Sequence, residues 1–170
     1  MQGIFGELFG LYFDNFKTAH LRFQWADFTC DGKFVVASVH NHATKSGNHV
    51  CVWSTESFRL LRVMERHEFP IIKVLGHPKI PHLAVTAGRD GRVCYWDVVR
   101  GSCVRELVLR HEASQQPIDA LDACFDPSGD QLAVCDLWGQ LTVMGPGNTK
   151  VFQSTPSSQF FDIDVAAFVR

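Results

Sequence analysis

The segment VCYWD at residues 93–97 decides the fold, because the chain repeats it. A second copy, VCVWS, occupies residues 50–54, and the two tryptophans, Trp53 and Trp96, lie 43 residues apart. A third copy, LTVMG at residues 141–145, has Met144 in the tryptophan position, 48 residues after Trp96. A short apolar segment that recurs at this spacing indicates a repeat architecture, in which each repeat is one small unit of structure.

Each copy belongs to a longer pattern of short apolar runs separated by turns. The other runs are residues 23–28, 34–39 and 60–64 in the first repeat, 71–75, 83–87 and 104–109 in the second, and 121–125 and 132–135 in the third. Turn sequences such as CDGK at 30–33, GRDG at 88–91 and DPSG at 126–129 separate them. Asp and Gly favour such turns because they accept the positive φ of tight hairpins. Four short strands in a repeat of about 40 to 45 residues are typical of a β-propeller blade.

We therefore predict an all-β fold, a β-propeller of which three four-stranded antiparallel blades are visible. The predicted segments are an N-terminal extension at 1–20, which can belong to a preceding blade, a first blade at 21–65 with an insertion at 40–49, a second blade at 66–109, a third at 110–153 and a C-terminal tail at 154–170. Three blades form an arc whose outer blades each leave an apolar face uncovered. We expect the chain to be the C-terminal part of a larger propeller and, when expressed alone, to aggregate or self-associate.

The second repeat resembles the blade of a WD-repeat protein. In that family a His before the blade, a Ser or Thr on the second strand, an Asp in the next turn and the Trp of the third strand form a hydrogen-bonded chain. The matching residues here are His67, Thr86, Asp90 and Trp96. The resemblance implies that Asp90 orients the His67 ring and that the buried polar groups are all satisfied, which is a structural role rather than a catalytic one.

The flanking repeats depart from this pattern. In the third repeat, Trp138 stands where Asp90 stands in the second, and Val134 stands in the place of Thr86, so the polar chain is lost. The first repeat is lengthened between its second and third strands by HNHATKSGNH at residues 40–49, where a compact turn is expected.

A closer resemblance extends over residues 21–170. The chain is similar there to the last three blades of the propeller in the bromodomain and WD-repeat-containing family. The segments that carry this resemblance are residues 35–41, 86–91, 96–101, 124–131 and 135–141, with Gln159, Phe160, Phe161, Asp164, Val169 and Arg170 of the tail. It implies a nuclear, chromatin-associated scaffold that takes part in transcription regulation and binds other proteins, chromatin proteins among them. No bromodomain sequence is present in these 170 residues.

The same resemblance implies an alternative function. Members of the family are described as substrate receptors of cullin-RING ubiquitin ligases, in which a Trp-Asp-x-Arg box contacts the adaptor. Here WDVVR at residues 96–100 places Arg100 one residue late, so a solvated turn residue is the favoured interpretation of Arg100. The candidate contacts to a protein partner are Arg89, Arg92 and Arg100.

The composition excludes other functions. With 16 Lys and Arg against 18 Asp and Glu, a formal net charge of −2, the chain lacks the basic surface needed to bind nucleic acid or an anionic membrane directly.

The six cysteines show no C-x-x-C spacing and mostly lie in apolar runs. Buried free thiols in a reducing compartment, the nucleus or otherwise the cytoplasm, are therefore favoured over disulfides.

Three histidines in the insertion, His40, His42 and His49, could ligate zinc or another transition metal. A solvated loop is favoured, because the insertion offers no Cys, Asp or Glu as a further ligand, and we predict no metal and no cofactor. His77 and His82 flank two prolines, which predicts a β-turn with exposed imidazoles.

An enzyme built on a propeller is the less favoured alternative. The sequence shows no nucleophile elbow and no phosphate-binding glycine loop. Asp119 and Asp122 could form a pair of acids, but nothing places a partner beside them. We therefore predict no catalytic residue, and favour a module that binds other proteins. A third interpretation is that these blades only complete a larger propeller.

Overall fold

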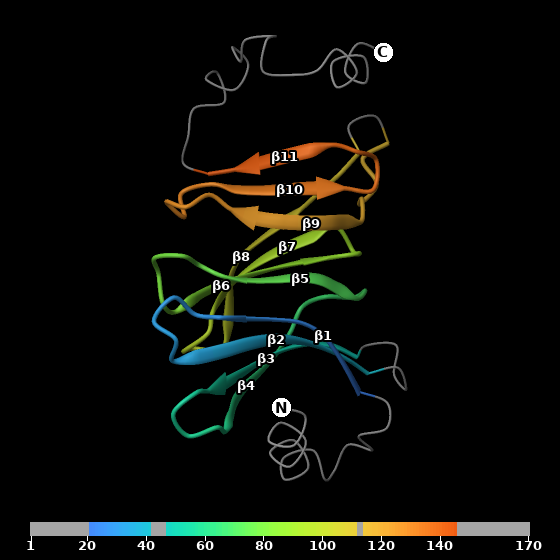
Figure 1. Cartoon of the computed structure of the whole chain (residues 1–170). Coiled ribbons are helices and arrows are strands. Elements are labelled where there is room, and N and C mark those ends of the chain that lie inside the picture. The colour runs from blue at the N-terminus through green and yellow to red at the C-terminus, as the bar shows by residue number, and fades with distance from the viewer. Residues whose placement is uncertain (1–20, 42–46, 112–113, 146–170) are drawn as a thin grey trace.

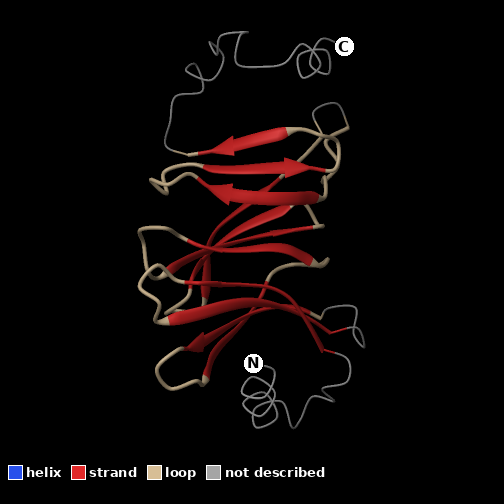
Figure 2. Cartoon of the chain, in the orientation of Figure 1, coloured by secondary structure: helices blue, strands red, loops and turns tan. Residues whose placement is uncertain are grey.

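The computed structural model describes residues 21–41, 47–111 and 114–145. Within these ranges the chain forms eleven β-strands in three antiparallel sheets, and no helix there could cross a membrane. Figures 1 and 2 show the three sheets stacked one above another. The prediction of an all-β fold made of antiparallel blades is confirmed.

The first sheet has four strands in chain order. They are β1 (Leu21–Phe28), β2 (Phe34–Asn41), β3 (Asn48–Ser54) and β4 (Leu60–Glu65). The predicted insertion is a long β2–β3 hairpin, in which His40 pairs with Asn48 and Val39 with His49. The two ends of the insertion are therefore strand rather than loop, and residues 42–46 lie outside the described residues.

The second and third sheets repeat the same meander. The second contains β5 (Ile71–Gly76), β6 (Leu83–Gly88), β7 (Arg92–Asp97) and β8 (Ser102–Val108). The third contains β9 (Ala120–Phe125), β10 (Leu132–Asp136) and β11 (Leu141–Met144). A fourth strand after β11, expected from the repeat, falls outside the described residues.

Two hydrophobic cores join neighbouring sheets, because side chains alternate between the two faces of a strand. The core between the first and second sheets contains Val36, Val50, Val52, Met64, Ile71, Val74, Ala84, Cys94, Trp96 and Val98. The core between the second and third sheets contains Val85, Ala87, Val93, Leu109, Ala120, Ala123, Leu132 and Val134. The second sheet is thus buried on both faces, and each fully buried Val or Leu contributes about 1.5–3 kcal/mol.

The two end sheets expose apolar side chains on their outward faces. On the first sheet Val63 is 50% exposed, and on the third sheet Leu141 is 63% and Val143 is 41% exposed. The register pairs these residues with Cys51, Cys135 and Ala133, which face away from the two cores.

The cysteines are free thiols, as predicted, but most of them are not fully buried. Cys51 and Cys94 lie in the sheet interiors, whereas Cys30 and Cys124 are exposed. Burial raises the pKa of the Cys51 thiol to about 12 and also raises that of Cys94. These two thiols stay protonated at neutral pH, so they act as small apolar side chains.

A candidate protein-interaction surface

Four polar residues form one buried chain of hydrogen bonds in the second sheet. The His67 Nδ1 atom lies 3.1 Å from both carboxylate oxygens of Asp90, and its Nε2 lies 2.7 Å from Thr86 Oγ1. The Trp96 indole Nε1–H donates to the same Thr86 oxygen at 2.8 Å. Since the carboxylate can only accept, a neutral His67 donates from Nδ1, and the Thr86 hydroxyl donates to Nε2. Every member therefore has a partner.

Asp90 also holds the turn between β6 and β7. Its carboxylate accepts the backbone N–H of Glu68 at 2.9 Å and that of Arg92 at 3.0 Å. Burial of Asp90 raises its pKa, but the hydrogen bond from His67 and those from the backbone outweigh that effect, so the pKa lies below its ordinary value of 3.8. The carboxylate is thus an ionised structural anchor with no free oxygen for a substrate.

Gly88 is needed because the polar chain passes directly over it. A Cβ at this position would lie 2.5 Å from His67 Nδ1 and 2.6 Å from Asp90 Oδ1, closer than real Cβ contacts come. The glycine of the GRDG turn therefore gives the imidazole and the carboxylate the space in which they meet.

Arg92, at the start of β7, contacts three acids. Its guanidinium lies 3.2 Å from Glu106 Oε1 and 3.7 Å from Asp90 Oδ2, and it contacts Glu68. Glu106 also pairs with Arg66, whose Nε lies 2.5 Å from Glu106 Oε2. The more exposed of these pairs, such as Arg66 with Glu106, are worth about 0–1 kcal/mol each. Arg92, one of the predicted partner contacts, is thus already engaged within the chain.

A hollow of about 480 Å³ opens beside this network, between the second and third sheets. Its lining comes from three loops, and consists of Glu68, Phe69, Pro70, Arg89, Asp90, Arg92, Val108, Arg110, Pro117 and Asp119. Phe69 is 56% exposed. Arg89 is exposed too, and within the described residues its guanidinium makes no hydrogen bond or ion pair. Arg110 donates one N–H to the Gln115 carbonyl at 2.8 Å.

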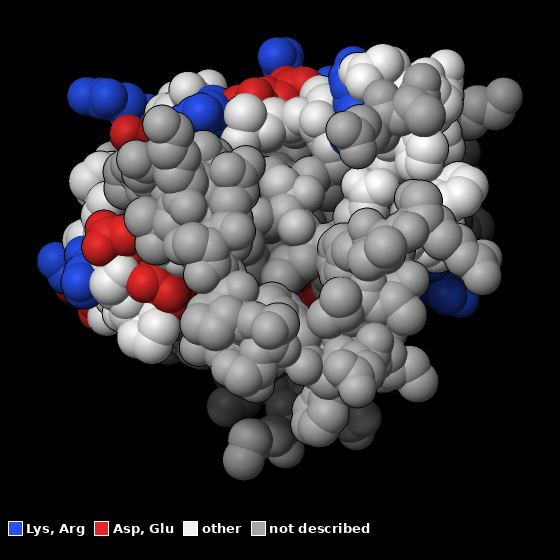
Figure 3. Space-filling model, turned by 90° about the horizontal axis from the view of Figure 1, so that it is seen from above, with Lys and Arg blue, Asp and Glu red and all other residues white. Residues whose placement is uncertain are grey.

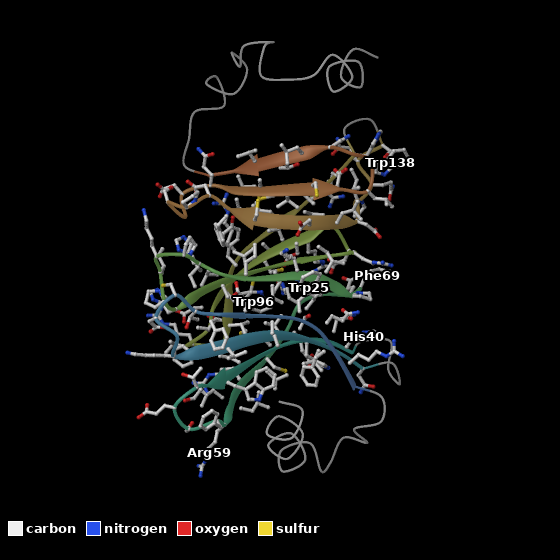
Figure 4. All side chains as sticks on the ribbon, in the orientation of Figure 1. Trp25, His40, Arg59, Phe69, Trp96 and Trp138 are labelled. Carbon is white, nitrogen blue, oxygen red and sulfur yellow. The ribbon has the colours of Figure 1, made fainter. Side chains whose placement is uncertain are left out.

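The β10–β11 turn extends this surface. The backbone N–H of Leu137 donates to the Asp119 carbonyl at 2.9 Å, which places the turn beside the hollow. Leu137 and Trp138 are 62% and 68% exposed, and Figure 4 shows Trp138 on the same side of the molecule as Phe69. We call the set Phe69, Arg89, Arg110, Leu137 and Trp138 the loop surface.

Charges on the visible end of the molecule are mixed. Figure 3 shows blue Lys and Arg side chains interspersed with red Asp and Glu side chains around the edge of the molecule in this view. A partner would therefore meet charges of both signs rather than a field of one sign.

Arg100 lies far from the other two predicted contacts. It follows the end of β7, whereas Arg89 and Arg92 are at its start, so the three arginines do not share a surface. The Arg100 side chain is 81% exposed, with Nη1 3.7 Å from Asp97 Oδ2. Asp97 accepts the backbone N–H groups of Val99 and Arg100, and so fixes the turn itself.

The prediction of an exposed His77 is wrong. Its ring is buried and lies 4.9 Å from that of Phe125. Nδ1 accepts the backbone N–H groups of Lys79 and Ile80, and Nε2 donates to the Gly129 carbonyl at 3.0 Å. His77 thus joins two sheets through a contact 52 residues distant in sequence, which no local turn pattern reveals. His82 is exposed, as expected.

Two of the three insertion histidines, His40 and His49, are partly buried rather than solvated. His40 Nδ1 lies 2.7 Å from Asn48 Oδ1, and His49 Nδ1 lies 3.1 Å from Glu65 Oε1. His42 lies outside the described residues. Among the residues that are described, no three His, Cys, Asp or Glu side chains come together in a way that could hold a metal ion.

The two acids Asp119 and Asp122 have different surroundings and do not form a pair. Lys73 Nζ lies 2.8 Å from Asp122 Oδ1, and this contact lowers the pKa of Asp122. The same ammonium group lies 4.8 Å from the centre of the Trp25 ring. Trp25, Lys73 and Asp122 thus form a row across β1, β5 and β9, which the sequence did not suggest, while Asp119 lines the hollow.

Comparison with a solved structure identifies the architecture. The model superposes on the β-propeller domain of Cps50 (Swd1) from Myceliophteria thermophila with a TM-score of 0.58, at 18% identity, over 74% of this chain and 35% of that one. The fold is that of a β-propeller. Its three sheets are consecutive blades, and the buried polar chain belongs to the second blade.

Curated relatives of this propeller include proteins of several kinds. Mouse periodic tryptophan protein 2 homolog is 33% identical over 58% of the chain and 10% of its own length. A putative BTB/POZ domain and WD-repeat protein of Acanthamoeba polyphaga mimivirus is 25% identical over 56% and 16%, respectively. The target of rapamycin complex subunit wat1 of Schizosaccharomyces pombe is 27% identical over 69% and 35%.

The chain spans about a third or less of the length of these relatives. No protein-family model matches it.

Proposed function

We propose that this propeller is a non-enzymatic protein-interaction module whose partners dock on the loop surface. One contrast carries the proposal. Asp90 and His67 are enclosed, and their side chains form hydrogen bonds with other groups of the blade. Phe69 and Arg89 project into solvent beside the hollow. Binding residues commonly sit on loops held by a rigid scaffold, and aromatic residues and Arg are enriched among the residues that dominate binding energy.

Within this role, we place the protein in a nuclear, chromatin-associated assembly that regulates transcription. The support is the resemblance of residues 21–170 to the bromodomain and WD-repeat-containing family. One relative is named as a subunit of the target of rapamycin complex, which supports the proposal that this protein acts within a multiprotein assembly. Microscopy of the tagged protein tests the location, and a purely cytoplasmic distribution would contradict it.

A second candidate function is that of a substrate receptor of a cullin-RING ubiquitin ligase. The exposed Arg100 guanidinium, 81% accessible at the end of β7, is the observation in its favour. Co-precipitation of the ligase adaptor should then fall when Arg100 is replaced by Ala. Equal recovery by wild type and Arg100→Ala would rule out this contact.

We also propose that further propeller blades pack on the outward faces of the end sheets. The exposed Val63 and Leu141 side chains support this, because large uncovered apolar faces are rare on isolated soluble domains. Light scattering of the purified chain should show self-association. A monodisperse monomer that melts cooperatively would contradict the proposal.

The docking proposal is tested by quantitative affinity purification from nuclear extract with a matched pair of double variants. One is Phe69→Ala with Arg89→Ala. The control is Phe58→Ala with Arg59→Ala. Figure 4 shows Arg59 on the opposite side of the molecule from Phe69, and the neighbouring Phe58 is 60% exposed against 56% for Phe69. We expect the loop-surface variant to lose partners that the control retains. Identical sets of partners for both variants would refute the loop surface as the docking site.

A further inference from the structure

The second and third blades differ at one equivalent position. In the second blade Trp96 lies opposite Ala84, points toward the first blade and is 1% exposed. In the third blade Met144 lies opposite Leu132 and points toward the second blade. The Met144 side chain is smaller and more flexible than the indole of Trp96.

A cavity of about 560 Å³ remains at this place. Its floor is apolar and includes Leu107, Phe125, Leu132 and Met144, which also pack on the core between the second and third blades. The volume lies within the range of about 300–1,000 Å³ that is usual for ligand sites. The cavity opens near the end of β7 and the start of β8, whereas the hollow of the loop surface is at the other ends of the same strands.

Four polar side chains line this cavity, and they differ in whether they are free to bind a ligand: His77, Tyr95, Arg105 and Asp130. His77 has both ring nitrogens engaged with backbone groups. The exposed Asp130 carboxylate competes with Asp126, the closer acceptor, for the single Ser128 hydroxyl proton. Arg105 is exposed, and within the described residues its guanidinium has no hydrogen bond or ion pair. The available cation beside the apolar floor is therefore Arg105.

The Tyr95 ring lines the cavity next to Arg105. Among the residues that the structure describes, no hydrogen bond reaches its hydroxyl group. Burial raises the pKa of Tyr95, while the nearby Arg105 charge acts in the opposite direction. Tyr95 thus stays a neutral hydroxyl donor at physiological pH, and together with Arg105 it complements an anionic group.

We propose that this cavity is a second binding site, separate from the loop surface, for a partner peptide that inserts an aromatic side chain flanked by Glu or Asp. The aromatic side chain would occupy the space that Met144 leaves beside Phe125. The flanking carboxylate would pair with Arg105. An isolated buried charge is not required, since Arg105 stays at the exposed mouth.

The probes for this site are three N-terminally labelled, amidated pentapeptides: Ser-Glu-Trp-Glu-Ser, Ser-Lys-Trp-Lys-Ser and Ser-Glu-Ala-Glu-Ser. Binding to the full chain is measured by fluorescence polarisation. We expect the acidic Trp peptide to bind at least tenfold more tightly than the other two. Arg105→Glu should reverse the order of the two Trp peptides, and Arg59→Glu, outside both proposed sites, should leave the affinities for all three peptides unchanged.

Met144→Trp is the decisive variant. It should fill the cavity, abolish binding of the acidic Trp peptide and leave the melting temperature equal or higher. No preference among the peptides in wild type, or unchanged binding in Met144→Trp, would overturn the proposal. A lower melting temperature in Met144→Trp, with no peptide binding in wild type, would show that the chain itself fills the cavity. The outcome does not depend on the affinity purification, because that experiment alters the other ends of the strands.

Discussion

The interface between the first and second blades and that between the second and third share one strand pattern but are filled differently. At the first, Trp96 is enclosed opposite Ala84. At the second, Met144 lies opposite Leu132 beside a cavity of about 560 Å³. The alternation of apolar residues is therefore enough to join two blades. The size of the residue at the tryptophan position decides whether the junction is fully packed.

The second and third blades also differ at the positions of the buried polar chain. In the third blade Val134 replaces Thr86 and is fully buried, so the site that would need a polar partner is apolar. Removing both partners of a buried hydrogen bond is nearly neutral, whereas removing one leaves the other unsatisfied. Asp136 holds the third-blade turn instead, accepting the backbone N–H groups of Trp138 and Gln140 at 2.9 and 3.0 Å.

The largest predicted effect is at the packed interface. Trp96→Ala should lower the free energy of unfolding by about 3–5 kcal/mol, because it removes a buried indole and leaves a cavity. Met144→Ala should cost clearly less, since Met144 is only partly buried and already borders a cavity. Urea unfolding followed by circular dichroism measures both. Equal losses for the two variants would mean that the interfaces are packed alike.

Thr86→Val should have the next largest effect, about 1–3 kcal/mol. The change makes the second blade like the third at this position, but the Trp96 indole N–H and the His67 ring stay behind without their shared partner. The reverse change, Val134→Thr, buries a new hydroxyl group and should also destabilise. A stabilised Thr86→Val would show that the polar chain is dispensable in the second blade too.

These differences mark how far the sequence could predict the structure. The strands followed from short apolar runs that recur between turns, and the four polar residues were identifiable through the resemblance of the second repeat to a WD-repeat blade. His77 could not be placed, because its burial depends on a carbonyl 52 residues away. The separation of Arg100 from Arg89 follows from the direction of β7, so a strand count could have found it. The hollow and the cavity depend on how loops and blades pack together, which no single repeat encodes.

The pH dependence of stability should show the role of Asp90. The third blade has no titratable counterpart, because Trp138 occupies the place of Asp90 there. The folded pKa of Asp90 lies below its ordinary value of 3.8, so its stabilisation is fully present above that value and is lost as the pH falls through the lower folded pKa. Asp90→Asn should cost about 1–2 kcal/mol at neutral pH, because the amide oxygen can keep one backbone N–H while the amide NH2 faces the other donor. The variant should also lose less stability than wild type between neutral and acidic pH. Parallel pH profiles, from urea unfolding at each pH, would contradict this role of Asp90.

The smallest effect should come from the residue that occupies the place of Asp90 in the third blade. Trp138 is 68% exposed, and its ring makes a tilted contact with His111 at 5.2 Å. Trp138→Ser should therefore change the free energy of unfolding by no more than about 0.5 kcal/mol, as for most surface substitutions. The turn should survive, because Asp136 holds it through the backbone N–H of residue 138, which serine keeps. A loss comparable to that of Asp90→Asn would mean that position 138 also anchors its blade, and that the two turns differ in chemistry but not in structural importance.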